Sequence, residues 1–167
     1  MHKRKNLYVP TKMQYVRGER PAVKCIFCAI RDKAENVVNL TIYETDTFII
    51  SVNLYPYNPG HLIIFPRKHL EHYEELSADD ALELHQLTVQ SLQILKEVYT
   101  PQGFNMGFNE GRVAGASIEH LHFHLVPRYA NEIGFLDIIN NDRIIVEDPR
   151  QSVTKIKDLF HRTASSQ

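Results

Sequence analysis

The feature that most constrains this chain is a run, from 118 to 128, in which three histidines alternate with apolar residues. Alternate side chains of a β-strand point to the same face. We therefore expect His120, His122 and His124 to share one face, roughly 6.6 Å apart. The residues between them then face a core: Leu121, Phe123 and Leu125. Each imidazole needs hydrogen-bond partners, so the row predicts a site. Either a metal bound by imidazoles or a histidine nucleophile with helpers fits.

The composition favours one globular domain and argues against two classes of partner. With 167 residues and 43% hydrophobic residues, the chain can bury a substantial core. A formal net charge of -1 gives no overall field that would attract nucleic acid or a membrane surface. No apolar run approaches the roughly 18 residues of a membrane helix, and no apolar segment follows the basic start as in a signal peptide. We expect a cytoplasmic protein that binds neither nucleic acid nor a membrane.

Periodicity and turn signals predict an antiparallel α+β fold. Ser77, with Asp80 three residues later, marks the start of a long helix that ends near residue 99. An amphipathic helix is expected at about 151–162, and 25–30 is expected as a compact turn. The predicted strands are 41–44, 47–51, 61–65, 104–108 and 118–128. We divide the chain into an N-terminal arm (1–24), a main domain (25–130) and an extension of the same globular unit (131–167).

The loop before the histidines has the composition of a phosphate-binding segment. Gly111 and Gly115 permit backbone conformations that other residues avoid, and the small side chains at 114–116 let a ligand approach main-chain N–H groups. Asn109 adds an amide, Arg112 a charge and Ser117 a hydroxyl. A plain hairpin loop is the alternative.

A phosphate cradle beside a histidine row suggests covalent nucleotidyl transfer, in which a neutral imidazole attacks phosphorus. His122 is the natural nucleophile, because it has a histidine on either side. Two other classes stay open: a metalloenzyme with all three histidines on one catalytic metal, and a nucleotide-binding module without catalysis. None of these needs an organic cofactor.

The only two cysteines, Cys25 and Cys28, have the spacing that lets two thiolates bind one zinc ion. A closed structural site needs two further ligands. A redox disulfide and a pair of inert thiols are the alternatives.

The motif from His120 to Val126 resembles the signature of the histidine triad family, His-x-His-x-His followed by two apolar residues. The approach from Asn109 to Ser117, the pair Asn53-Leu54 and the segment 60–64 are also similar to that family. The resemblance covers about residues 25–130. Segments 54–62, 103–105 and 114–117 look like the diadenosine tetraphosphate phosphorylase branch, and 7–15 resembles the arm of that branch.

The resemblance implies roles for individual residues. His122 would be the nucleophile and His124 would contact the transferred phosphate. Ser117 would lie near the leaving oxygen. Other residues would bind the nucleotide: Asn53 and Leu54 in the nucleoside pocket, and Asn109, Gly115, Ala116 and Ser117 at the phosphates. The family fold is an antiparallel five-stranded sheet with a helix, and two such sheets usually join in a homodimer.

The resemblance also bears on the metal and on the reaction. Zinc-carrying triad proteins and galactose-1-phosphate uridylyltransferase imply that His69 and His120 complete a structural zinc site, with His72 as the substitute for His69. Hydrolases of the fragile-histidine type carry Gln where this chain has Ala116, so the small residue favours attack by inorganic phosphate. The implied substrate is an adenine dinucleoside polyphosphate. Hydrolysis of AMP conjugates, such as nucleoside phosphoramidates or adenylylated amines, is the alternative.

Overall fold

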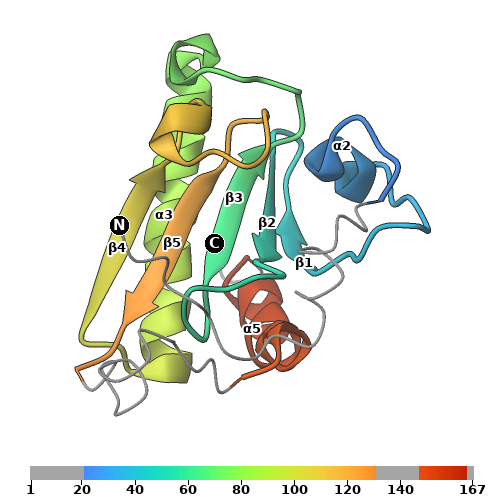
Figure 1. Ribbon diagram of the computed structural model, residues 1–167. Helices are drawn as coiled ribbons and strands as arrows, with labels where there is room; N and C mark the ends of the chain where they lie inside the picture. The colour runs from blue at the N-terminus through green and yellow to red at the C-terminus, as the bar shows by residue number, and fades with distance from the viewer. Residues whose placement is uncertain (1–20, 131–146, 165–167) are drawn as a thin grey trace, which may run out of the picture.

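The computed structural model describes residues 21–130 and 147–164 and contains one five-stranded sheet with strand order β1-β2-β3-β5-β4 (Figure 1). Each strand pairs with its neighbours in antiparallel orientation. The strands are β1 (Thr41–Glu44), β2 (Phe48–Val52), β3 (Leu62–Pro66), β4 (Gly103–Phe108) and β5 (Phe123–Arg128). The helices are α2 (Ile26–Arg31), α3 (Ala78–Tyr99) and α5 (Pro149–Ala164), with 3-10 turns η1 (Tyr73–Glu75) and η2 (Arg112–Ala114). Most of the expected N-terminal arm lies outside the described residues.

The long helix α3 begins where the sequence predicts. The Ser77 hydroxyl accepts a hydrogen bond from the Asp80 N–H at 3.1 Å, and the Asp80 carboxylate accepts one from the Ser77 N–H at 3.2 Å. This reciprocal pair satisfies two backbone donors that a helix start leaves open. The helix ends at Tyr99, and the next residue, Thr100, adopts a left-handed conformation before Pro101.

Alternation along the strands separates two apolar layers. Leu62, Ile64 and Leu125 point toward α3 and α5, in the core cluster that also contains Ile156 and Phe160 of α5. The intervening side chains point to the other face, where Ile49, Ile63 and Phe65 pack with Phe27 of α2. The sheet therefore has helices α3 and α5 on one side and the short helix α2 on the other.

The register places His124 on the α2 side of the sheet. His124 lies opposite Ile63 of β3 and Gly107 of β4, and opposed residues share a face. Its neighbour Leu125 is fully buried on the α3 side. The alternation expected for this strand is therefore confirmed where the strand exists.

Among the described residues, no helix combines the length and apolar character that crossing a bilayer requires.

Two sequence expectations need correction. The expected strand from 118 to 128 begins only at Phe123, so His120 and His122 precede it. The ladder ends there because the Leu121 N–H donates to the carbonyl of Leu70 instead of to a strand, at 2.6 Å. The segment 25–30, expected as a turn, forms helix α2, in which the N–H of Asp32 donates to the Cys28 carbonyl at 2.9 Å.

Candidate active site and metal centre

His122 lies just before β5 and is held by the backbone of its own segment. Its Nδ1 lies 2.7 Å from the carbonyl oxygen of His120, which can only accept, so we assign the proton to Nδ1. The other ring nitrogen, Nε2, then carries a free lone pair. The imidazole is 5% exposed and meets the ring of His124 edge-on, with centroids 4.8 Å apart. This is the geometry of an oriented nitrogen nucleophile.

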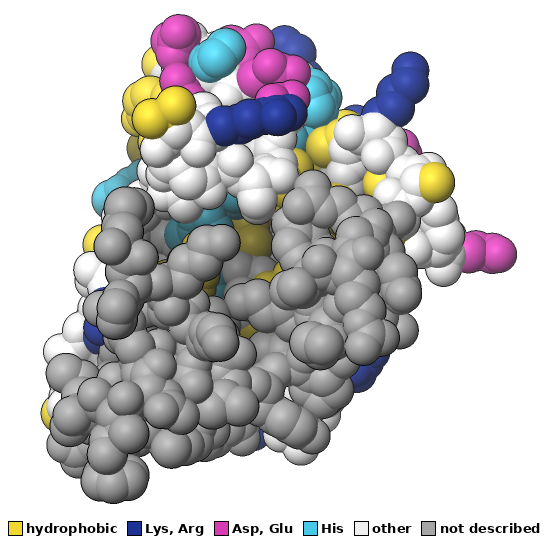
Figure 2. Space-filling model, viewed as in Figure 1, with side chains coloured by type: hydrophobic (Ala, Val, Ile, Leu, Met, Phe, Trp, Pro, Cys, Tyr) yellow, Lys and Arg dark blue, Asp and Glu magenta, His cyan; other side chains and the backbone are white. Residues whose placement is uncertain are grey.

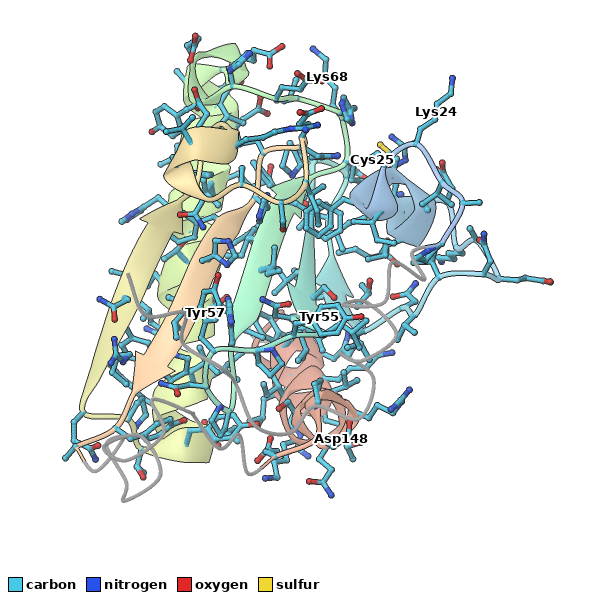
Figure 3. The ribbon with its side chains drawn as sticks, viewed as in Figure 1. Lys24, Cys25, Tyr55, Tyr57, Lys68 and Asp148 are labelled. Carbon is cyan, nitrogen blue, oxygen red and sulfur yellow. The ribbon has the colours of Figure 1, made fainter. Side chains whose placement is uncertain are left out.

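A fourth histidine, His61, orients His124. The backbone N–H of Tyr57 donates to Nδ1 of His61 at 3.0 Å, so the proton of His61 lies on Nε2. That Nε2–H donates to Nδ1 of His124, also at 3.0 Å. The remaining proton of His124 is therefore on Nε2, where it can donate to a ligand. Tyr57, labelled in Figure 3, belongs to the loop before β3, and its ring stacks on His124 with centroids 6.0 Å apart.

The histidines of this site are neutral at physiological pH. Burial, followed by the charges of His124 and His122, lowers the pKa of His61 to about 3. Burial also lowers the pKa of His124 to about 4, and that of His122 moves in the same direction for the same reason. A free imidazole titrates near about 6.5. A neutral His122 ring with its proton on Nδ1 keeps the Nε2 lone pair that a nitrogen nucleophile needs.

Gly60 allows His61 to enter the site. It has a positive φ of 76°, which favours glycine. A Cβ at this position would lie 2.9 Å from ring atoms of Tyr99. The chain therefore turns tightly against α3. This turn places His61, which is fully buried, immediately before strand β3.

The loop from Asn109 to Ser117 is folded on itself. The N–H groups of Ala114, Gly115 and Ala116 all donate to carbonyls within the loop, so they are not the open phosphate donors that the sequence suggests. Within the described residues, the N–H of Ser117 has no such partner, and its side chain is exposed. The charge of Arg112 pairs with Glu119 at 2.9 Å. Ser117 is thus one group that this loop leaves available to a ligand.

Asn53 directly follows β2, and Asn109 directly follows β4. Phe108 lies opposite Phe123 in the ladder, so Asn109 comes just after the last residue pair of β4 and β5. The side-chain oxygen of Asn53 accepts from the N–H of Tyr55 at 3.0 Å, and its nitrogen lies 3.3 Å from Nδ1 of His61. Leu54 is half-buried against the main core. Both ends of the Asn53 amide are therefore already engaged in this conformation.

The four residues expected to bind zinc converge on one point. Ligand atoms of Cys25, Cys28, His69 and His120 all lie within 4.8 Å of one another. The sulfur of Cys25 lies 3.3 Å from Nδ1 of His120, and that of Cys28 lies 3.4 Å and 3.7 Å from Nδ1 of His69 and His120. A tetrahedral zinc site has sulfur–nitrogen edges of about 3.6 Å, given zinc bonds of roughly 2.3 Å and 2.05 Å. The cluster fits a four-coordinate structural zinc. In Figure 3, Cys25 stands at the start of α2.

Both histidines of this cluster have their second nitrogen occupied. Nε2 of His120 donates to the carbonyl of Pro66 at 2.9 Å, which leaves Nδ1 as its lone pair. Nε2 of His69 lies 3.4 Å from the carboxylate of Glu71. Such outer contacts fix the tautomer of metal-binding histidines. Burial and the neighbouring Cys25 raise the pKa of the Cys28 thiol to about 11, so metal binding must displace its proton.

The geometry separates the three histidines of the motif. Among the described residues, the ligand group that converges contains His120 but neither His122 nor His124. This argues against one catalytic metal held by all three. Figure 2 shows histidine side chains in the upper part of the viewed face, between acidic and basic groups.

Sequence reasoning missed two residues of this site. It placed His61 in a strand without a role, although a histidine at the head of an otherwise apolar buried strand is unusual. It also gave no role to Phe27, whose ring lies 5.0 Å from that of His122. Nothing in the sequence alone connects Phe27 to a histidine 95 residues later.

Comparison with known proteins agrees with this fold. A 95-residue segment is 42% identical to an AP-4-A phosphorylase of Mycobacterium tuberculosis, and the match covers 56% of this chain but only 49% of that protein. A bis(5'-nucleosyl)-tetraphosphatase (asymmetrical) of Schizosaccharomyces pombe is 25% identical over 100 residues, 60% of this chain and 55% of that protein. The chain thus spans about half the length of these relatives.

A solved structure shows the same fold. The crystal structure of a zinc-bound histidine triad family protein from Mycobacterium smegmatis superposes with a TM-score of 0.70 at 21% identity, over 86% of this chain and 98% of that one. The HIT domain model matches residues 34–131, well over half of the chain. This chain therefore belongs to the HIT domain family.

Proposed function

We propose that this chain is a nucleotidyltransferase that cleaves adenine dinucleoside polyphosphates through a covalent intermediate on His122. The observation that carries the proposal is the neutral His122 imidazole, whose Nδ1 proton is held by a backbone carbonyl while Nε2 keeps its lone pair. The similarity to the mycobacterial AP-4-A phosphorylase supports the substrate class.

In the first step, Nε2 of His122 attacks the phosphorus next to one adenosine. A P–N bond forms, the P–O bond to the next phosphate breaks, and its electron pair leaves with that oxygen. With diadenosine tetraphosphate, the leaving group is ATP. The imidazole becomes positively charged, and the carbonyl of His120 stabilises it through the Nδ1 proton. His124 donates through Nε2 to an oxygen of the transferred phosphate. The hydroxyl of Ser117 lies near the leaving oxygen and can donate a hydrogen bond to it.

In the second step, an oxygen nucleophile breaks the P–N bond and restores the imidazole. Inorganic phosphate would give ADP, and water would give AMP. Ala116 stands where hydrolases of the fragile-histidine type carry Gln, which is why we favour phosphorolysis. The chain is similar to both a phosphorylase and a tetraphosphatase, so water is the alternative nucleophile.

The proposed metal has a structural role. Cys25, Cys28, His69 and His120 would hold zinc with four protein ligands, so the ion would have no open position for substrate. When bound, it would crosslink α2 to the segment before β5.

The decisive experiment is incubation with diadenosine tetraphosphate, with and without inorganic phosphate, with products separated by chromatography. ADP and ATP that form only with phosphate support the phosphorylase, and AMP and ATP without phosphate indicate a hydrolase. Cleavage of adenosine phosphoramidates alone would point to AMP conjugates as substrates. No turnover of any adenylylated compound would refute the proposal. A nucleotide-binding module without catalysis would then remain.

We further propose that the chain forms a homodimer through β4 and acts in the cytoplasm. β4 is the last strand in the sheet order, and Met106 on it is 53% exposed. Light scattering of the wild type and of Met106→Lys tests this: a dimer that dissociates in the variant supports the interface, and a wild-type monomer contradicts it.

A further inference from the structure

We propose that Phe27 is a positioning residue for His122, and that the Cys25–Cys28 cluster gives it this role by fixing helix α2. The inference deepens the proposed function, on which it rests, because it concerns the same nucleophile. Phe27 stands between the two cysteines, and its ring projects into the layer beneath the histidines.

Phe27 contacts the nucleophile directly. Its ring centroid lies 5.0 Å from that of His122, with the planes inclined by 49°. The His120 carbonyl fixes one edge of the His122 ring, and His124 meets it from another side at 4.8 Å. A ring held at one atom can still tilt about that hydrogen bond. The Phe27 ring packs against the His122 ring and prevents this tilt.

The position of Phe27 is itself rigid. Its side chain is 4% exposed and stacks on Phe65 of β3, with centroids 4.5 Å apart and planes inclined by 27°. It also meets the His120 ring edge-on at 5.6 Å. An aromatic ring with neighbours on several sides has little room to rotate.

Helix α2 is short, so its position depends on what it is attached to. At one end, Cys25 precedes the first turn and Cys28 lies within it, and both converge with His69 and His120. At the other end, the Arg31 side chain donates to the carbonyl of Arg67 at 2.7 Å. A six-residue helix gains little stability from its own hydrogen bonds, so these attachments set where Phe27 lies.

Two contacts therefore connect the cluster to the nucleophile. One runs through the backbone of His120 to Nδ1 of His122, and the other runs through α2 and the Phe27 ring. Disturbing the cluster changes the orientation of His122 without removing any group that touches substrate. The expected consequence is a loss in kcat with little change in KM, since a small misplacement of reacting atoms can cost about 100-fold.

The test compares Phe27→Leu with Phe48→Leu. Both replace a buried phenyl ring, but Phe48 lies on the opposite face of the sheet, in the cluster with α3. We expect Phe27→Leu to lower kcat by about 10- to 100-fold at unchanged KM, and Phe48→Leu to reduce thermal stability while kcat stays close to the wild-type value. A raised KM with unchanged kcat would instead make Phe27 a wall of the nucleoside pocket and overturn the inference.

A second readout needs no turnover. Nδ1 of His122 lies 2.7 Å from the carbonyl oxygen of His120. Its proton should therefore give a protected imidazole N–H resonance in the zinc-loaded wild type and in Phe48→Leu. Loss of this signal to solvent exchange is expected in Phe27→Leu and after zinc is removed with a chelator. A signal that persists in both cases overturns the inference. If the wild type forms no nucleotidyl adduct, the proposed function fails, while this resonance still reports whether Phe27 holds the ring.

Discussion

Replacing His61 tests whether a buried histidine outside the triad motif sets the chemistry of His124. His61→Leu removes the Nε2–H that donates to Nδ1 of His124 at 3.0 Å, in a side chain with no exposed surface. Leaving the buried Nδ1 of His124 without its donor costs about 1–3 kcal/mol. Borne by the transition state, this cost corresponds to a loss of roughly 5- to 150-fold in kcat. KM should change much less, because His61 does not contact substrate in the proposed mechanism.

Two further variants separate the hydrogen bond from the volume of the ring. In His61→Gln, the amide nitrogen can occupy the place of Nε2 and keep the donor to His124, so most activity should return. In His61→Asn, the shorter amide reaches only the place of Nδ1, so the loss should match that of His61→Leu. The assay is steady-state cleavage of diadenosine tetraphosphate with phosphate present. Equal activity of the Leu and Gln variants, whichever level they share, would show that the donor at the place of Nε2 does not set the activity.

Three other predictions concern folding, acid and metal. Gly60→Ala should lower the free energy of unfolding in urea by about 1–3 kcal/mol, because φ is 76° and the new Cβ would collide with a tyrosine ring; an unchanged midpoint contradicts this. Burial lowers the pKa values of His61 and His124 to about 3 and 4, below the unfolded value of about 6.5. The unfolded state then binds more protons, so the free energy of unfolding should fall as pH drops from about 6.5 toward 4. Denaturation midpoints that rise on acidification would contradict this. Cys28→Ser should lose bound zinc measured by atomic absorption while His72→Ala keeps it, because Cys28 belongs to the converging ligands and His72 does not; equal zinc content in the two variants would rule out this ligand set.

Local patterns were sufficient to predict most of the fold. The Ser77–Asp80 box marks the start of α3 because a helix start must satisfy its own backbone donors, and both residues lie within four positions of each other. The alternation in β5 predicts which face His124 occupies, because side chains in a strand repeat every two residues. The antiparallel sheet and the five expected strands are confirmed, except that the last strand begins at Phe123 and not at residue 118.

What the sequence could not provide depends on contacts between distant segments. The early end of β5 follows from the hydrogen bond of Leu121 to Leu70, which no strand pattern reveals. The loop N–H groups near Gly115 were expected to be open, but 3-10 geometry uses them internally. The role of His61 became visible only when the sheet brought it within 3.0 Å of His124, 63 residues away.

The metal site likewise combines a local pattern, the cysteine pair, with residues that are distant in the sequence. The spacing of Cys25 and Cys28 predicts two ligands of one metal, since both come from one turn of chain. His69 and His120 came from family resemblance, because neither is near the cysteines in sequence. In the folded chain their nitrogens lie within 3.4 Å and 3.3 Å of the sulfur atoms, so the expected set of four is geometrically consistent.

Trapping the intermediate on His122 would test the covalent mechanism at its first step. The protein is mixed with diadenosine tetraphosphate without phosphate, quenched in alkaline denaturant, digested and analysed by mass spectrometry, since the phosphoramidate bond is labile in acid. A covalent mechanism on His122 predicts one AMP group on the peptide containing His122, none in His122→Gly, and turnover by that variant that is partly rescued by free imidazole. Steady turnover with no adduct, or an AMP group on another residue, would contradict it.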